Sequence, residues 1–302
     1  MSSKNIRSLV SISVVLVLAA LLAWGGSRGG LLTETPFGIL PIFVLCAALA
    51  FAVQWLAFIP AYKFQTEHFY DLIGSLTYLT LVACALILSG SVDIRSLLLA
   101  ALVSIWAIRL GSFLFIRISK DGSDSRFDAI KPVLLRFLTA WTIQGLWVFV
   151  TCSSALAAIT SESTLPLGWV GLTGLALWVF GFGFEVIADH QKRVFRRAQQ
   201  GQKGFIQSGL WAYSRHPNYF GEIVLWMGVS LIALPVLSGW QLVTMISPVF
   251  VTLLLTRISG IPMLEASADK RWQGQANYED YKQRTPVLVP RLSKPLVIEV
   301  AQ

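Results

Sequence analysis

Long runs of apolar residues occupy most of the chain and limit what it can fold into. Eight such runs fall at residues 8–24, 37–59, 71–90, 96–116, 133–158, 167–187, 219–234 and 240–256. A helix needs about 20 apolar residues to cross the hydrocarbon core of a bilayer, so these runs predict transmembrane helices. The composition agrees, because only 13% of the residues are charged, against about 25% in soluble domains. We therefore predict an all-α, polytopic transmembrane helix bundle.

The number of helices in this bundle is predicted to be seven or eight. The seventh run is the shortest, and Leu234 and Pro235 separate it from the eighth, so one kinked helix is the alternative to two. No small-residue cleavage motif follows the first run, which favours an uncleaved first helix. Residues 1–302 are predicted to form a single integral membrane domain, since no polar segment between the runs is long enough to bury its own core.

Lysine and arginine are distributed unevenly over this topology. If the N-terminus is cytoplasmic and eight helices span the membrane, only Arg28 and Arg95 of the 24 Lys and Arg residues lie outside, and Arg109 lies within a span. This excess of basic residues on the cytoplasmic side follows the positive-inside rule and predicts that both the N- and C-termini are cytoplasmic. The formal net charge of +8 is then explained by membrane topology, and no nucleic-acid partner is expected.

Ionisable residues within the spans are candidates for a functional site, because charge in a bilayer is costly. Arg109 is the clearest, since it lies eight residues before Arg117, which marks the end of its predicted helix. Asn218 and Glu222 lie one turn apart at the start of the seventh span. The alternatives are a snorkelling arginine and structural ion pairs. We predict a polar cavity that opens to the cytoplasm.

The segment DHQKRVFRRAQQ concentrates positive charge just after the sixth run. On a helix its Asp189, Arg193 and Arg196 share one face. Arginine guanidinium groups match phosphate oxygens, so this face favours a polyanionic ligand, and a solvated face or a contact with anionic lipids is the alternative. The chain has no HExxH, no P-loop and no GxGxxG after a predicted strand, so neither a metal site nor a soluble nucleotide-binding fold is expected.

The stretch GLWAYSRHPNYFGEI, residues 209–223, resembles the C-terminal signature of the bacterial membrane family related to steroid 5α-reductases. Further segments match that family's pattern in the same order: RLGSFLFIRI with GSDSRFD, GFGFEVIADHQKRVFR, SGIPMLE and YEDYKQRTPVLVP. The resemblance covers residues from about 100 to 290. It implies a bundle of seven or eight helices in the bacterial inner membrane, with its cofactor bound on the cytoplasmic side.

This resemblance implies an NADPH-dependent oxidoreductase that reduces an activated C=C bond of a lipophilic, steroid-like or enone substrate. Together with the position of Arg109, it gives the expected cofactor-binding residues: Arg109, Asp189, Arg193, Arg196, Tyr213, Arg215, His216, Asn218, Tyr219 and Glu222. Arginines of this set are expected to hold phosphates, and Asn218 and Glu222 to orient the nicotinamide amide.

The proton donor for such a reduction is expected among Glu67, Tyr78 and Tyr219, because a donor must stabilise the developing enolate oxygen. The N-terminal half departs from the family pattern. Gln54 is followed by Trp55 where a Gln-Glu pair is expected, and Trp106 stands in place of a tyrosine. The resemblance therefore leaves the substrate and the proton donor open.

Two other function classes stay open. S-adenosylmethionine-dependent methyltransferases of the isoprenylcysteine carboxyl type share a similar RHP-x-Y-x-G-E stretch, here Arg215 to Glu222. S-adenosylmethionine carries no phosphate, so the arginine-rich face favours the reductase. A non-enzymatic lipid-binding or transport protein would show internal repeats with broken helices, and none is visible. The expected partners are a lipophilic small molecule and membrane lipids.

Overall fold

The computed structural model describes residues 3–90, 93–122, 124, 126–199 and 204–291, and within these it is predominantly helical. The helices are α1 Ser3–Gly26, α2 Ile42–Lys63, α3 Tyr70–Ser89, α4 Ile94–Asp121, α5 Leu134–Ile159, α6 Gly168–Ala198, α7 Pro217–Ala233, α8 Ile246–Leu253, α9 Ile261–Trp272 and α10 Ala276–Arg284. In this part of the chain, eight helical segments are long and apolar enough to span a membrane. The predicted all-α polytopic bundle is confirmed, and the chain is an integral membrane protein.

Two of the predicted runs differ from the structure in detail. The run at 37–59 begins in a hairpin formed by β1 (Leu32–Thr35) and β2 (Gly38–Pro41). Pro41 is extended, with ψ 133°, so α2 begins only at Ile42. The run at 240–256 is a 3-10 helix (Gly239–Met245), then α8, then a π-helical segment (Leu254–Ile258). Before it, Leu234–Val236 forms a short 3-10 helix at the predicted break.

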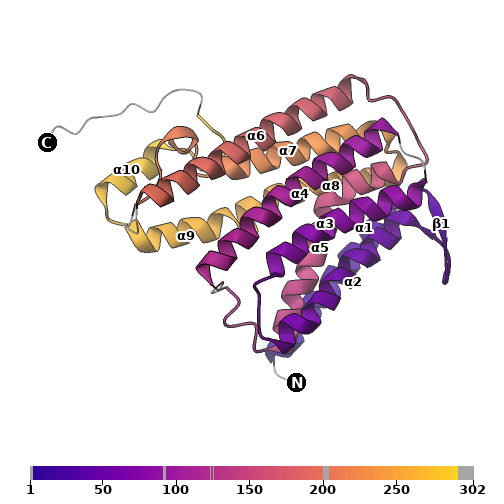
Figure 1. The fold of residues 1–302 in the computed structure, drawn as a ribbon, viewed down its shortest axis with the longest axis horizontal. Coiled ribbons are helices and arrows are strands. Elements are labelled where there is room, and N and C mark those ends of the chain that lie inside the picture. Colours follow the sequence, from indigo (N-terminus) through magenta and orange to yellow (C-terminus); the bar gives the residue numbers. More distant parts are fainter. Residues whose placement is uncertain (1–2, 91–92, 123, 125, 200–203, 292–302) are drawn as a thin grey trace. The chain divides into compact units, whose positions relative to one another are not determined.

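The chain divides into two compact units, which are described separately. Unit 1 consists of Met1–Thr173 with Val229–Ser247, and unit 2 of Gly174–Gly228 with Pro248–Gln302. In unit 1, α5 packs against α1, α2 and α3, and α3 packs against α4 (Figure 1). The helix α5 is central in this unit, because 89% of its membrane-spanning stretch is buried.

A buried arginine fixes one end of unit 1. Asp93 caps α4 by accepting hydrogen bonds from the backbone N–H groups of Arg95 (2.7 Å) and Ser96 (3.2 Å). The guanidinium of Arg95, a residue that is only 2% exposed, donates to the carbonyls of Pro166 (2.7 Å) and Ile232. It thereby satisfies backbone oxygens that would otherwise be buried without partners. Arg95 is a structural link between the start of α4, the loop before α6 and the end of α7.

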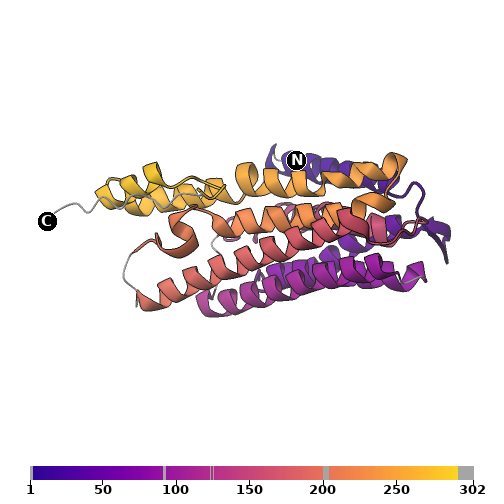
Figure 2. The same cartoon turned by 90° about the horizontal axis from the view of Figure 1, so that it is seen from above.

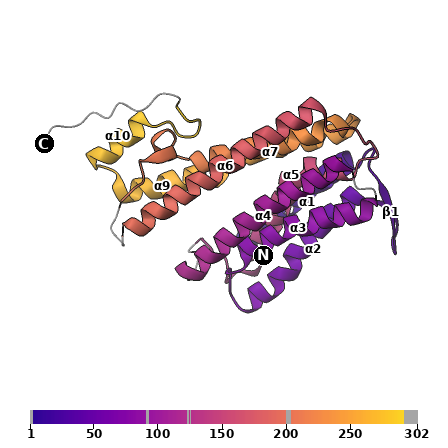
Figure 3. The same ribbon diagram turned by 45° about the horizontal axis from the view of Figure 1, so that its top comes forward.

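In unit 2, α6 and α7 run side by side because both present glycines where their backbones meet (Figure 3). A Cβ added at Gly221 would lie 2.6 Å from the carbonyl oxygen of Gly181, and one at Gly228 would lie 2.5 Å from that of Gly174. Each helix repeats its glycine after seven residues, which is two turns, so the contacts fall along one face. Small residues at such spacing allow close packing of membrane helices.

The C-terminal segment of unit 2 folds back onto the segment before α7. There, α9 and α10 lie next to each other, as Figure 2 shows. The hydroxyl of Tyr281 donates to the carbonyl oxygen of Trp211 (2.8 Å), and the backbone N–H of Arg215 donates to that of Pro286 (2.9 Å). These bonds bring together two stretches that are far apart in sequence, and both contribute to the lining of a cavity.

Candidate functional site

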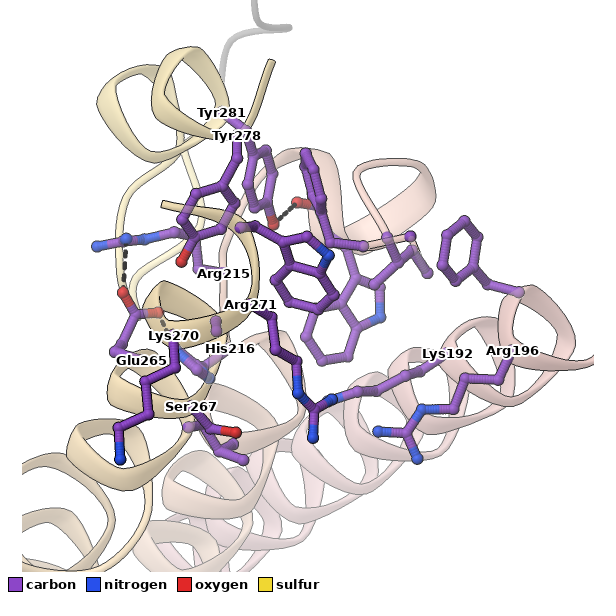
Figure 4. A pocket seen from close by; sticks show the side chains of 18 residues that line it. Lys192, Arg196, Arg215, His216, Glu265, Ser267, Lys270, Arg271, Tyr278 and Tyr281 are labelled. Atoms are coloured by element: carbon purple, nitrogen blue, oxygen red, sulfur yellow. Dashed lines mark hydrogen bonds and ion pairs between the residues drawn. The ribbon is translucent and has the colours of Figure 1, made fainter. Parts of the chain in front are cut away.

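A cavity of about 630 Å³ in unit 2 is lined by residues of α6, of the segment before α7, and of α9 and α10 (Figure 4). Its size is within the range of about 300–1,000 Å³ that is typical of small-molecule and cofactor sites. The lining is cationic at some positions and aromatic at others. The charged and histidine side chains that line it are Lys192, Arg196, Arg215, His216, Glu265, Lys270 and Arg271.

Glu265 of α9 links two consecutive residues of the RHPNY segment. Its carboxylate accepts from Nη1 of Arg215 (2.7 Å) and pairs with Nε2 of His216 (2.8 Å). Burial lowers the pKa of His216, although the hydrogen bond to Glu265 opposes this shift. The imidazole is therefore neutral near pH 7, and when Nε2 carries the proton that Glu265 accepts, Nδ1 becomes a hydrogen-bond acceptor.

Arg215 thus neutralises the negative charge of Glu265, and the other cations give the lining a net positive charge. Within the described residues, no ion pair involves Arg196, Lys270 or Arg271. Figure 4 shows the side chains of Lys192, Arg196 and Arg271 extending to the same side of the cavity. Three cations from two helices that face one space have the chemistry that suits phosphate groups.

Aromatic rings form another part of the wall. Phe205 packs against Trp272, Tyr278 and Tyr281, with ring centroids 5.6, 5.3 and 5.5 Å apart. The indole Nε1 of Trp272 is buried and has no hydrogen-bond partner within the described part of the chain. On the α6 side, Nζ of Lys192 lies 4.5 Å from the ring centroid of Trp211. A ligand with a flat ring and anionic groups matches this combination of surfaces.

The structure brings three of the predicted cofactor-binding residues to this cavity, namely Arg196, Arg215 and His216. Tyr219 stacks on His216, with centroids 5.7 Å apart and an interplanar angle of 11°, at the start of α7. Asn218 lies in the same turn, and its Oδ1 is buried without a partner among the described residues.

The other predicted residues of unit 2 lie near the cavity in sequence but are not part of its lining. Glu222 lies one turn beyond Asn218 in α7, and Asp189 is 9% exposed in α6. Arg193 is exposed on α6, one turn before Arg196. Tyr213 is held through its backbone, whose carbonyl oxygen accepts from the N–H of Arg291 (3.0 Å).

Three further candidates, Glu67, Tyr78 and Arg109, belong to unit 1. Glu67 is 3% exposed and accepts from Lys131 Nζ (2.5 Å) and from the backbone N–H of Asp124 (2.9 Å). Burial raises its pKa, but these hydrogen bonds outweigh that effect and hold the pKa below its usual value. Tyr78 is buried with its ring edge-on to Trp106, and Arg109 is half-buried in α4.

Comparison with known proteins identifies the family. The family model described as "Protein of unknown function (DUF1295)" matches residues 57–285. The chain belongs to this family. The curated relatives of this DUF1295 protein include "3-oxo-5-alpha-steroid 4-dehydrogenase 1" of Rattus norvegicus, which is 31% identical over 120 residues (39% of this chain and 40% of the relative). The predicted relation of the family to steroid 5α-reductases is therefore confirmed.

Two more relatives extend the comparison. The protein of the same name from Mus musculus is 30% identical over 169 residues, which is 54% of this chain and 58% of the relative. An uncharacterized protein of Schizosaccharomyces pombe is 22% identical over 179 residues, 49% of this chain and 52% of the relative. The chain spans about half the length of the curated relatives it matches. No solved structure matches it.

Several residues of the cavity in unit 2 are not predicted from the sequence. Lys192, Lys270 and Arg271 were counted only as cytoplasmic charges, and the aromatic residues of the C-terminal segment received no role. For the aromatic part of the wall, a signal was available: the YEDYKQRTPVLVP segment of the resemblance contains both Tyr278 and Tyr281.

Proposed function

We propose that this DUF1295 protein is an NADPH-dependent membrane oxidoreductase that reduces an activated C=C bond of a lipophilic, steroid-like or enone substrate. The observation that carries the proposal is the cavity in unit 2, where cations of α6 and α9 meet beside an aromatic wall. The relatives named 3-oxo-5-alpha-steroid 4-dehydrogenase support the reaction class. We place the protein in the bacterial inner membrane with this cavity on the cytoplasmic side.

The residues present fit NADPH. The nucleotide carries a pyrophosphate and a 2′-phosphate, and Arg196 and Arg271 offer guanidinium groups without ion-pair partners in the described part of the chain. Trp272 offers a buried N–H that lacks an acceptor there, and the rings around Phe205 offer flat apolar surfaces. S-adenosylmethionine has a positively charged sulfonium and no phosphate, so a cavity with excess cations disfavours it.

When bound, NADPH supplies the hydride, and the chain supplies binding, orientation and proton control. Asn218 has a buried Oδ1 without a partner among the described residues, which fits an acceptor for the N–H of a carboxamide. Glu67 is ionised by its contact with Lys131, which makes it a poor proton donor. Among the predicted catalytic residues, we therefore propose Tyr78 or Tyr219 as the donor to the developing enolate oxygen.

The test is a titration of the purified full chain with NADPH, in which binding is measured through the fluorescence of the nucleotide. Arg196→Gln and Arg271→Gln should each weaken NADPH binding by about tenfold, because each removes a charge-assisted contact to phosphate. The matched control is Arg197→Gln, because Arg197 is exposed on the same helix but does not line the cavity. We expect this control to change the affinity by less than about twofold.

Two results would count against the proposal. Equal losses in all three variants would mean that only the general positive charge of the surface attracts the nucleotide. Tighter binding of S-adenosylmethionine than of NADPH, unaffected by Arg196→Gln, would replace the reductase with the methyltransferase.

A further inference from the structure

We propose that a second cavity, in unit 1, binds the headgroup of a zwitterionic phospholipid that carries a primary amine. This cavity has a volume of about 700 Å³. Its lining comes from the end of α1, the loop after it, both strands of the hairpin, the start of α2, and Glu162 from the loop after α5. The site is separate from the cavity of unit 2 and does not depend on the function proposed for it.

Backbone hydrogen bonds place two opposite charges beside this cavity. The N–H of Leu31 donates to the carbonyl oxygen of Thr160 (2.7 Å), and the N–H of Glu162 donates to that of Gly29 (3.2 Å). Gly29 has φ +72°, a conformation that glycine adopts without strain. The loop after α1 is thereby joined to the loop after α5, which brings Glu162 next to the segment that carries Arg28.

These two charges line the same space without neutralising each other. Arg28 lies over the ring of Trp24, with Cζ 4.7 Å from the centroid. Among the described residues, no ion pair involves Arg28 or Glu162. Two opposite charges at one cavity match a ligand that itself carries both signs. The phosphate of a phospholipid fits Arg28, and the headgroup ammonium fits the carboxylate of Glu162.

The chemistry of the lining distinguishes a primary amine from a quaternary one. A primary ammonium donates hydrogen bonds to a carboxylate, whereas a quaternary ammonium has no N–H and is recognised by aromatic faces. Trp24 is the one aromatic residue among the described residues of this lining, and Arg28 already covers its ring. Phosphatidylethanolamine therefore fits better than phosphatidylcholine, and an anionic lipid leaves Glu162 without a partner.

The surroundings of the cavity match the boundary between lipid and water. Trp24 and Trp240 are 48% and 63% exposed, with ring centroids 5.3 Å apart, and Phe37 at the hairpin tip is 91% exposed. Exposed aromatic residues of this kind are typical of membrane interfaces. The cavity itself is lined by apolar side chains, including Leu40 and Val44, which suit the glycerol and upper acyl region of a lipid.

The experiment is native mass spectrometry of the full chain after incubation in bilayer discs that contain equal amounts of phosphatidylethanolamine and phosphatidylglycerol. We expect the wild type to retain phosphatidylethanolamine in preference to phosphatidylglycerol. Glu162→Gln should reduce that preference by about tenfold while phosphatidylglycerol is still retained, because only the ammonium contact is lost. Arg28→Gln should reduce the retention of both lipids.

Two matched variants control for general effects of charge. Glu34→Gln removes an exposed carboxylate of β1 that does not line the cavity, and Arg7→Gln removes an exposed arginine near the other end of α1. Both should retain lipid as the wild type does. The proposal is overturned if the wild type shows no preference between the two lipids. It is equally overturned if Glu162→Gln and Arg28→Gln retain them in wild-type amounts, since the lipid would then bind elsewhere.

Discussion

Replacement of Glu265 by alanine removes the carboxylate that links α9 to the RHPNY segment. The side chains of Arg215 and His216 are 12% and 6% exposed, and that of Glu265 is 23% exposed. Loss of one partner from a fully buried pair costs about 3–5 kcal/mol, and from an exposed pair less than about 1 kcal/mol. For this partly exposed carboxylate we expect a cost of about 2 kcal/mol, which corresponds to about 30-fold in an equilibrium constant.

The consequence should be local, because the two contacts join α9 to residues just before α7. Hydrogen exchange measured by mass spectrometry should show about 30-fold faster exchange in α9 and around His216 for Glu265→Ala. Glu265→Gln keeps two polar atoms and loses the charge, so it should be intermediate. The rest of unit 2 should exchange as in the wild type.

The control for this prediction is Asp280→Ala in α10. Asp280 pairs with Arg284 at 3.3 Å, but its side chain is 59% exposed, so its removal should change exchange little. Equally small changes in the exchange of α9 for Glu265→Ala and Asp280→Ala would refute this role of Glu265. In that case the carboxylate would not hold the helix against the RHPNY segment.

Three further predictions concern the stability of the fold in detergent, measured by thermal unfolding. Gly181→Ala should destabilise the fold by about 1–3 kcal/mol, since its Cβ would lie 2.5 Å from the backbone of α7. The control is Gly183→Ala, whose Cβ would meet nothing within 4 Å and which should be neutral. Equal effects of the two variants would contradict the glycine contact. Arg95→Met should cost about 2–4 kcal/mol by leaving buried carbonyls without donors, and an unchanged unfolding temperature would contradict this role. The pKa of Glu67 is lower in the folded protein than its ordinary value of 4.5, so its ionised form stabilises the fold at pH values above 4.5. This contribution is lost as the pH falls through the folded-state pKa. Glu67→Gln should lack that acid-dependent loss, and an unchanged acid profile would show that the contact with Lys131 does not contribute.

The membrane-spanning helices were largely predictable because their signal is local. A run of about 20 apolar residues has few alternatives to a spanning helix, and the break at Pro235 follows from the absence of a backbone N–H in proline. The hairpin before α2 was missed because its strands have four residues each, too short for an alternating pattern to stand out from the apolar run that follows.

The cavity was only partly predictable, because it depends on contacts between distant segments. Arg196, Arg215 and His216 were identified from a helical face and from the RHPNY resemblance. The contribution of α9 was not, since Glu265 and Arg271 lie in a polar stretch that resembles a solvated tail. Such a stretch becomes part of a site only when tertiary hydrogen bonds hold it there, as those of α10 and the following residues do.

The most direct test of the central claim is to identify the nucleotide that the purified full chain binds. The protein is extracted in detergent, incubated with equal concentrations of NADPH, NADH and S-adenosylmethionine, and examined by native mass spectrometry. The cationic cavity predicts one retained NADPH per chain, with NADH weaker because it lacks the 2′-phosphate. Retention of S-adenosylmethionine instead, or of no nucleotide at saturating NADPH, would contradict the account.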